Sequence, residues 1–424
     1  MRAGDQDAED LWAFERELAT LSIDRLDVAR PRLFELGLAP RYFARMRREA
    51  PVHHCVDGAY GSYWSITRHH DVERVELDTG TFSSDHYNGG ITITSRPDDP
   101  QFLPAFIAMD PPRHTEQRRV IAPAFSPQRL GEMGTQIRRW SREILDGLPI
   151  DEAFDWVDRV SIELTARTLA SLLGYPIERS RDLIRWSDAM VALPGTPAFP
   201  TLEDKLSVMK ECFATFETIW RERLKAPTGN DLVSMLAGRP ETREMSREEF
   251  YGNILLLIVG GNDTTRSSIS GSVFAFDRFP AELKKLRAEP GLVAALTPEV
   301  LRWQTPLAHM RRTAMRDVSI GGRQIAKGDK VVLWYLSANR DETVFTQADD
   351  FMIDRPNSRR HLSLGIGIHR CIGARLADVQ VRTLWEEILK RFPRIEVLRP
   401  PARSFSTFTH GYSELQVRIP ARLA

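Results

Sequence analysis

The 424-residue chain has little cysteine: only Cys55, Cys212 and Cys371 occur. So few thiols, in an odd number, argue against a disulfide framework and for a reducing compartment. Lysine plus arginine and aspartate plus glutamate both number 58, so no excess charge attracts nucleic acid or a membrane surface. No apolar run is long enough to span a bilayer, and the opening MRAGDQDAEDLWAFEREL lacks the apolar core of a signal peptide. We therefore expect a soluble, cytoplasmic protein.

Two further signatures are missing. The sequence has no glycine-rich dinucleotide motif and no cysteine set with the spacing of an iron–sulfur cluster. It also has no internal repeat and no low-complexity linker, while 42% hydrophobic and 27% charged residues are typical of a globular protein. If the chain has a redox activity, its electrons must therefore come from a partner. We expect one domain over residues 1–424, with residues 1–20 as a loosely ordered or helical lead-in.

The apolar periodicity predicts mainly helix. Helical spacing is found in SIELTARTLASLLGY and LSVMKECFATFETIWRERL, and NILLLIVGG is typical of a buried central helix. Period-two patterns predict short strands. The expected elements are a strand pair in 60–74, helices over about 115–290, a hairpin across Gly321-Gly322 with a following strand in 313–335, a helix over 373–391 and strands from 395. This balance predicts a mainly α fold with small peripheral sheets.

One stretch, LSLGIGIHRCIGARLA at residues 362–377, places a cysteine in a glycine-rich hairpin that leads into a helix. Gly365 and Gly367 allow backbone conformations that a Cβ disfavours, and Gly373 lets the helix lie against a flat ring. Because Cys371 stands where the helix begins, free amide N–H groups and the helix dipole favour a thiolate. A lone cysteine is more often a buried structural residue, but this setting, with His369 two residues away, suits axial ligation of haem iron.

The pattern Gly365-x-Gly367-x-His369-x-Cys371-x-Gly373 resembles the haem-binding loop of the cytochrome P450 monooxygenases. The resemblance implies the cytochrome P450 fold, a large helical domain around a buried haem b, with Cys371 as the ligand of the iron. The family's loop usually opens with phenylalanine seven residues before the cysteine. Leu364 stands there in this chain, which bears on the reduction potential of the iron and leaves the ligand in place.

Residues 255–268, LLLIVGGNDTTRSS, predict one continuous helix with Leu256, Gly260 and Thr264 stacked on one face. The alternative is a helix that ends at the glycine pair, followed by a second helix capped by Asp or Thr. The resemblance implies that Gly260 leaves room for dioxygen over the haem, and that Asp263 and Thr264 form the catalytic acid–alcohol pair that delivers protons. We also expect the helix to widen locally at this pair, with water in the opened hydrogen bonds.

Several cationic residues resemble the family's haem anchors. In MDPPRHTEQRRVIAPAF, His114 and Arg118 lie one helical turn apart, a spacing that is otherwise common on solvated faces. In PLAHMRRTAMRDVSIGG, alignment on DVSIGG selects Arg312, with Arg311 as the neighbouring alternative. Together with His369, these residues would bind the two haem propionates through charge-assisted hydrogen bonds.

A further motif, TPEVLRWQTP, places Glu299 and Arg302 three residues apart on a helix. Alone, this spacing indicates only a weak surface ion pair. The resemblance implies instead a buried pair, joined by Arg355 of FMIDRPN, that braces the cysteine loop.

The resemblance also implies an electron donor, because soluble bacterial members of the family use a small acidic ferredoxin that an NAD(P)H-dependent reductase reduces. A basic surface near the cysteine loop would steer such a partner, although a solvated face is the simpler interpretation of surface arginines. The arginines concerned are Arg359, Arg360, Arg370, Arg375 and Arg382, together with Arg113, Arg129, Arg138 and Arg139.

Resemblance to the bacterial branch that hydroxylates medium-chain alkanes and fatty acids at the terminal carbon extends over LLIVGGNDTTR, PLAHMRRTA, GIHRC and QVRTLWEEILKRF. The implied substrate is apolar. Its expected pocket lining is Leu256, Val259, Leu307, Ala308 and Phe408. The alternatives are a terpenoid or steroid hydroxylase of the same family, a peroxide-driven peroxygenase and a haem-based sensor or ligand carrier. The acid–alcohol pair argues against the peroxygenase, and the lack of an output module argues against the sensor.

Overall fold

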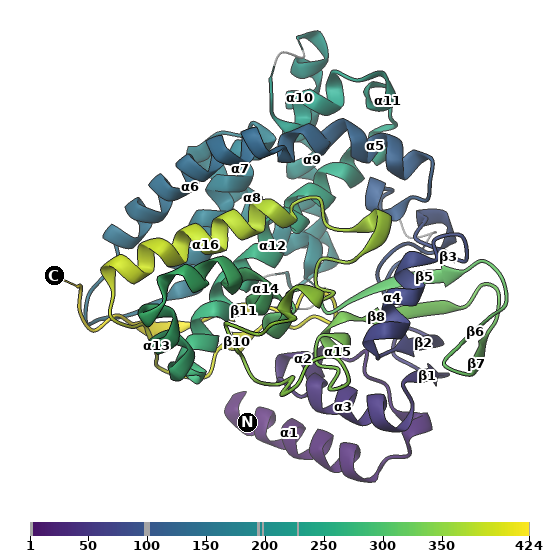
Figure 1. Ribbon diagram of the computed structural model, residues 1–424. Helices are drawn as coiled ribbons and strands as arrows, with labels where there is room; N and C mark the ends of the chain where they lie inside the picture. The colour runs from purple at the N-terminus through teal and green to yellow at the C-terminus, as the bar shows by residue number, and fades with distance from the viewer. Residues whose placement is uncertain (1–2, 97–101, 193–195, 197–198, 227–228, 424) are drawn as a thin grey trace.

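A computed structural model describes residues 3–96, 102–192, 196, 199–226 and 229–423 of the chain (Figure 1). Its helices are α1 (Ala3–Thr20), α2 (Pro31–Glu35), α3 (Ala39–Glu49), α4 (His69–Leu77), α5 (Arg113–Ile121), α6 (Pro127–Asp146), α7 (Glu163–Leu173), α8 (Ser180–Val191), α9 (Leu202–Lys225), α10 (Leu232–Ala237), α11 (Pro240–Arg243), α12 (Arg247–Arg278), α13 (Pro280–Ala288), α14 (Val293–Gln304), α15 (Tyr335–Ala338) and α16 (Ala374–Arg391). The predicted mainly α fold is confirmed.

The strands are short and form peripheral sheets. They are β1 (Val52–Cys55), β2 (Tyr63–Ile66), β3 (Phe82–Ser83), β4 (Ala153–Asp155), β5 (His309–Ala314), β6 (Val318–Ile320), β7 (Arg323–Ile325), β8 (Lys330–Trp334), β9 (Glu396–Val397), β10 (Ala402–Arg403), β11 (Tyr412–Glu414) and β12 (Gln416–Arg418). The largest sheet has the order β1-β2-β8-β5-β3, with β2 and β8 parallel and the other pairs antiparallel. This sheet lies beside the helical body (Figure 1).

The central helix α12 is continuous over 32 residues, so the alternative of two helices broken at the glycine pair is wrong. It begins where the side chain of Ser246 accepts a hydrogen bond from the Glu249 amide, the usual N-cap arrangement. Helix α12 contacts α7, α8, α14 and α16. It therefore crosses the core of the helical body and presents residues to several neighbours at once.

The expected elements are largely found, with one correction. The hairpin β6–β7 turns at Gly321-Gly322 and β8 follows it, α16 spans the predicted C-terminal helix, and the tail forms β9 to β12. The lead-in is helical as α1. The strand pair predicted within 60–74 is wrong in part, because only β2 lies there. Its partner β1 precedes it in the chain, and α4 starts at His69, where the polar residues HHDVER favour a surface helix turn over a strand.

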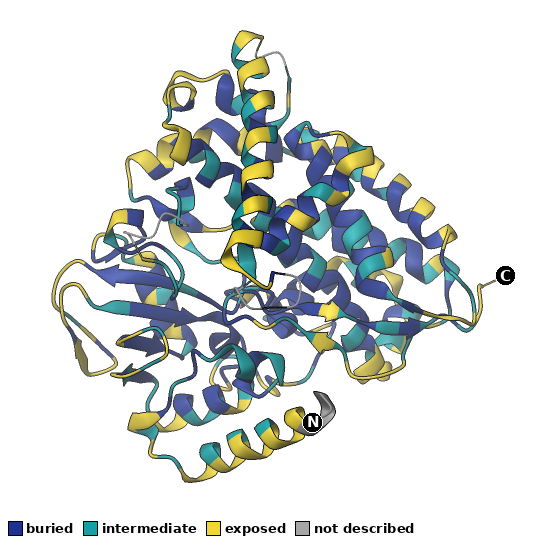
Figure 2. Cartoon of the chain, turned by 180° about the vertical axis from the view of Figure 1, so that it is seen from behind, coloured by how far each residue is buried: buried dark blue, intermediate teal, exposed yellow. Residues whose placement is uncertain are grey.

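Burial follows the same division. Buried residues concentrate in the interior helices and in the five-stranded sheet, whereas α1 next to the N-terminus exposes one face to solvent (Figure 2). Both faces of the sheet are covered, since Val332 and Trp334 pack in one apolar cluster while Val331 and Leu333 pack in another. Among the described residues, no helix is both long and apolar enough to cross a membrane.

Candidate active site

A cavity of about 630 Å³ lies between α12, the cysteine loop and strand β5. From α12 it is lined by Leu256, Gly260 and Thr264, which the predicted helical spacing places on one face. Cys371 lines the same cavity, so the acid–alcohol segment and the cysteine loop share one space. The other two cysteines, Cys55 and Cys212, are buried in apolar clusters and do not line this cavity.

The cysteine loop has the backbone that its glycines predict. Gly365 and Gly367 have φ values of +62° and +67°, a region that residues with a Cβ rarely adopt. The amide of Cys371 donates to the carbonyl of Leu364 at 2.7 Å, which closes the hairpin. α16 then starts at Ala374, and a Cβ added to Gly373 would lie 3.8 Å from the Cys371 sulfur. The loop thus holds the sulfur at a fixed point in front of the helix.

The thiol of Cys371 opens onto the cavity but is otherwise surrounded by protein. This burial raises its pKa, while hydrogen bonding from the Gly373 amide and the charges of Arg118 and Arg370 act in the opposite direction. The expected net stabilisation of a thiolate is therefore not found in the chain alone, since desolvation outweighs the helix start. A bound metal ion deprotonates a coordinating thiol. The amide groups at the start of the helix would then stabilise the thiolate that forms when iron binds.

Two buried histidines meet beside the cysteine loop. The rings of His114 on α5 and His369 lie 4.3 Å apart, and neither ring has a hydrogen-bond partner for its nitrogens. Burial, together with nearby positive charge, lowers the pKa of His114 to about 4 and that of His369 to about 2; the charge is that of Arg118 for His114 and mainly that of Arg312 for His369. Arg118 lines the cavity and donates to the carbonyl of Arg370. The predicted anchors thus come together.

Arg312 rather than Arg311 faces the cavity, because alternate residues of β5 point to opposite sides of the sheet. Arg312 is not free, however. It forms an ion pair of 3.0 Å with the buried carboxylate of Glu76 on α4, to which Tyr335 also donates a hydrogen bond at 2.5 Å. The sequence analysis missed Glu76, since a glutamate within the surface-like pattern of α4 carries no signal of its buried partner.

These residues fit a haem. His369, Arg118 and Arg312 line a cavity whose described lining includes only one carboxylate, Glu76, while His114 lies against His369 without lining the cavity, and the ring nitrogens of both histidines are unpaired. The lowered histidine pKa values reflect burial first and then positive neighbours, Arg118 for both histidines and Arg312 for His369. Two propionate groups would supply the missing hydrogen-bond acceptors and negative charges. Cys371 offers the sulfur, and the space between it and α12 offers room for the ring.

On the α12 side of the cavity, a Cβ built on Gly260 would meet no atom within 4 Å, so the helix leaves open space at that position. Thr264 directs its hydroxyl to the carbonyl of Gly260 at 2.9 Å. The expected widening is not found, because α12 is a regular α-helix throughout and this hydroxyl takes the place that was expected for water.

Asp263 points away from the cavity toward α8. Its buried carboxylate accepts a hydrogen bond from Ser187 at 3.1 Å and pairs with Arg266 at 2.8 Å. Arg266 pairs in turn with Asp188 at 3.1 Å, and the side chain of Asp188 is 44% exposed. Burial raises the pKa of Asp263 to about 6, although Arg266 opposes the shift. A chain of charged groups therefore links the buried acid to solvent, and neither Arg266 nor Asp188 was anticipated from the sequence.

The pair Glu299 and Arg302 on α14 is fully buried, as the family resemblance implied. Arg302 donates to Glu299 at 2.7 Å and to the backbone carbonyls of Asn339, Ala348 and Asp350. Arg355 also pairs with Glu299, at 3.1 Å. Ser363, at the start of the cysteine loop, donates to the carbonyl of Leu301 on the same helix. This network connects α14 to the segment that carries the cysteine.

The cavity wall is mostly apolar. Leu256, Val259, Leu307 and Phe408 line it as expected. Ala308 does not line the cavity. It is fully buried in the apolar cluster that contains Val332 and Trp334, because successive side chains of an extended segment point to opposite sides, and Leu307 takes the cavity side. Phe102, Leu103 and Phe106 add apolar surface to the wall, as do Met190 of α8 and Met209 of α9, and the two methionines were not anticipated from the sequence.

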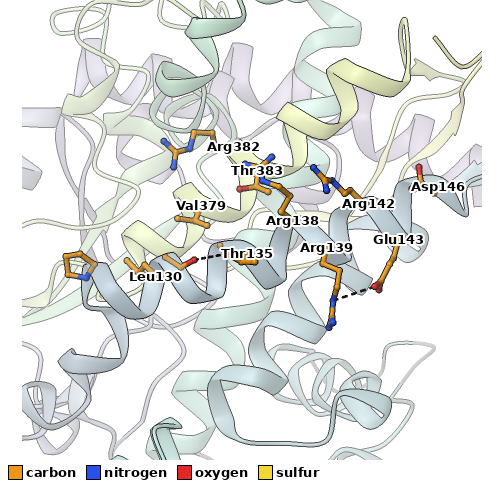
Figure 3. Close-up of a pocket in the computed structure, with 13 residues that line it drawn as sticks. Leu130, Thr135, Arg138, Arg139, Arg142, Glu143, Asp146, Val379, Arg382 and Thr383 are labelled. Carbon is orange, nitrogen blue, oxygen red and sulfur yellow. Dashed lines mark hydrogen bonds and ion pairs between the residues drawn. The ribbon is translucent and has the colours of Figure 1, made fainter. Parts of the chain in front are cut away.

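The expected basic surface splits into two parts. In the groove between α6 and α16, Arg138 pairs with Glu386 and Glu387, and Arg139 with Glu143 (Figure 3). Arg113, Arg129 and Arg382 also have acidic partners. The four arginines around the cysteine loop are exposed and form no ion pair with any described residue, and we call them the loop patch: Arg359, Arg360, Arg370 and Arg375.

Comparisons with known proteins agree with this site. The family model "Cytochrome P450" matches residues 200–409. Linalool 8-monooxygenase of Pseudomonas putida is 36% identical over 404 residues, which cover 93% of this chain and 99% of that protein. The solved structure of cytochrome P450-153 from Novosphingobium aromaticivorans is 44% identical, covers 93% and 99% of the two chains, and superimposes with a TM-score of 0.86. A methyl-branched lipid omega-hydroxylase of Mycobacterium tuberculosis is 29% identical over 388 residues, 88% of this chain and 90% of its own.

Fold and site thus define a haem-thiolate protein. The chain belongs to the cytochrome P450 family and is a monooxygenase that binds haem b through a cysteine thiolate. Its reaction uses O2 and electrons from a transfer partner, and it acts on an apolar substrate.

Proposed function

We propose that this monooxygenase hydroxylates the terminal carbon of medium-chain fatty acids or alkanes, with electrons supplied by a ferredoxin. The observation that carries the proposal is the cavity itself: one apolar space joins Leu256, Val259 and Phe408 to the residues that face Cys371. A terminal C–H bond is stronger than an internal one, so attack there must be imposed by the shape of the space. In this proposal the apolar walls of the cavity over the sulfur supply such control.

In this proposal Cys371 ligates the iron, and His114, Arg118, Arg312 and His369 bind the propionates. Haem bound at this thiolate supplies the activation of O2 and the insertion of one oxygen atom into a C–H bond. Gly260 keeps the adjacent face of α12 clear, since a side chain there would occupy the open space. The apolar walls exclude water and orient the substrate chain.

Protons are proposed to pass through the chain that starts at Asp188. The exposed carboxylate of Asp188 exchanges protons with solvent, Arg266 holds it beside the buried acid, and Asp263 receives the proton. Rotation of the Asp263 carboxylate toward the cavity would bring the proton to the hydroxyl of Thr264, one residue further along α12. The pKa of about 6 at Asp263 allows the group to gain and lose a proton near neutral pH.

A second substrate class has its own support. The relative from Pseudomonas putida is named for linalool, a terpenoid, whereas the relative from Mycobacterium tuberculosis is named for omega-hydroxylation of a lipid. We favour the straight chain because the resemblance to the terminal hydroxylases extends over four separate segments of this sequence. A terpenoid is the alternative that the following experiment separates.

Spectral titration of the holoenzyme with decanoic acid, decane and linalool tests the substrate class. A substrate that displaces water from the iron shifts the spin state and hence the absorption. The proposal expects saturable shifts with decanoic acid or decane and a weaker response to linalool. A shift with linalool alone would assign the enzyme to terpenoids and overturn the proposal.

The loop patch is the proposed ferredoxin surface because its four positive charges are exposed and have no acidic partners in the part of the chain that the structure describes. Charge reversal in Arg360→Glu should raise the ferredoxin concentration needed for half-maximal turnover about tenfold at low salt, and the difference should shrink as salt increases. Arg139→Glu in the groove is the control, since that arginine already pairs with Glu143. Equal effects of the two variants would place the partner elsewhere.

A further inference from the structure

One wall of the cavity is polar and positively charged. The segment 88–96 contributes Thr92, Thr94, Ser95 and Arg96 to the lining and rests on strands β5 and β8. The Arg311 amide donates to the carbonyl of Ile91 at 2.7 Å, and its guanidinium donates to the carbonyl of Ser95 at 2.9 Å. The sheet therefore fixes the segment that forms this wall.

Arg311 is a buried cation without an anion. Only 7% of it is exposed, its Nε has no hydrogen-bond partner, and no described carboxylate pairs with it. Its Nη2 would lie 1.9 Å from a Cβ at Gly89, whose φ of +113° also suits glycine, so the site makes room for the guanidinium. Burial lowers the pKa of Arg311 to about 10. Desolvation of an unpaired charge is costly, so an anion near this guanidinium would be favoured.

Lys330 adds a second charge on the same face of the sheet. Its ammonium donates to the carbonyls of Tyr60 at 2.7 Å and Ile93 at 3.4 Å, and it has no acidic partner among the described residues. Tyr60 itself lines the cavity. Burial lowers the pKa of Lys330 to about 8, and the charges of Arg311 and Arg96 lower it further. Three cations thus act on one another where no described anion balances them.

Other buried arginines of this chain are arranged differently. Arg302 and Arg355 share Glu299, and Arg312 on the opposite face of β5 pairs with Glu76. Arg311 is the neighbour of Arg312 in sequence, yet it has only backbone and hydroxyl partners. Among the described residues Arg311 and Lys330 have no acidic partner, so an anion bound at the adjacent cavity wall would offset part of their charge.

We propose that this wall binds the carboxylate of the substrate, which makes a medium-chain fatty acid rather than an alkane the preferred ligand. Arg96 and the hydroxyl groups of Thr92 and Ser95 contact the carboxylate, since they line the cavity. Lys330 and Arg311 lie behind them: Lys330 supplies charge, and Arg311 is a positioning residue that holds the segment. The inference rests on the proposed function, because it names the polar end of the same apolar substrate.

The experiment measures dissociation constants of the holoenzyme for decanoic acid, 1-decanol and methyl decanoate by spectral titration and calorimetry. The three probes share their chain and differ in charge. The wild-type enzyme is expected to bind the acid at least about tenfold more tightly than either neutral compound. Arg96→Ala and Lys330→Met should each weaken binding of the acid about tenfold and leave the neutral compounds unchanged.

Lys327→Met is the matched control, because Lys327 is exposed and lies three residues before Lys330. It should bind all three probes as the wild type does. Equal affinity of the wild type for acid and alcohol, or unchanged acid binding in both variants, would overturn the carboxylate proposal alone. Failure of all three straight-chain probes to bind would overturn both this proposal and the proposed function.

Discussion

Two buried ion networks of this chain differ in whether they reach the surface. The network of Glu299, Arg302 and Arg355 is sealed: each charge is buried, and backbone carbonyls take up the remaining donors. The network of Asp263 and Arg266 is open, because it continues to Asp188 at the surface. A sealed network has no path for a proton and can only hold structure. An open network can exchange a proton with solvent while its inner end stays dry. Two networks of similar side chains can therefore differ in function, because only the network whose last member is exposed can exchange protons with solvent.

The largest effect is expected from breaking the sealed network. Glu299→Gln leaves Arg302 and Arg355 buried without a counter-charge, which costs about 3–5 kcal/mol of unfolding free energy. Thermal unfolding and haem content of the purified variant measure this loss. Glu386→Gln is the control, since its partner Arg138 is partly exposed and such a pair contributes about 1 kcal/mol or less. If Glu299→Gln were as stable as the wild type, the network would not stabilise the segment that carries the cysteine.

The next effect concerns the hydroxyl between the open network and the cavity. Thr264→Ala keeps the fold, because Thr264 bonds only to the Gly260 carbonyl of its own helix. Hydroxylated product per NADH consumed should fall roughly a hundredfold while hydrogen peroxide rises, as for loss of a general acid–base group at the lower end of its range. Thr264→Ser restores the hydroxyl and should restore the product yield. An unchanged yield in Thr264→Ala would contradict the assigned role.

A smaller effect is expected at the outer end of the open network. Asp188→Asn removes the exposed carboxylate but leaves the buried pair of Asp263 and Arg266 intact. Turnover should fall about two- to fivefold, with a larger solvent deuterium isotope effect, because proton entry becomes slower. Asp182→Asn on the same helix is the matched control, since Asp182 bonds only to Tyr175 and Arg179. Identical isotope effects in the two variants would mean that protons enter by another route.

The smallest effect is a pH dependence of stability. The pKa of Asp263 is raised from 3.8 to about 6 in the folded chain, so the folded state holds this proton more tightly than the unfolded state. Its contribution to stability is present below about pH 4 and is lost as the pH rises through about 6. Asp263→Asn should remove this decline, which denaturant titrations at several pH values would detect. A parallel pH profile for variant and wild type would contradict the raised pKa.

Much of this molecule could be predicted because the signals are local. The backbone of Gly365 and Gly367, the stacked face of α12 and the β6–β7 hairpin follow from residues next to one another in the sequence. Partners of buried charges that no motif contains could not be predicted, as for Glu76, which meets Arg312 across more than 200 residues of chain, whereas the pair of Glu299 and Arg302 lies within one motif. The pKa of Cys371 was misjudged for a related reason: the helix start is local, whereas the burial that outweighs it depends on the whole fold.

The central claim is that the cavity presents the end of a straight chain to the face of α12 at Gly260. Regiochemistry tests it most directly. The holoenzyme, reconstituted with a ferredoxin, its reductase and NADH, is given decanoic acid, and the position of the new hydroxyl is determined by mass spectrometry. The account predicts 10-hydroxydecanoic acid as the main product. A mixture dominated by hydroxylation at internal carbons would contradict it.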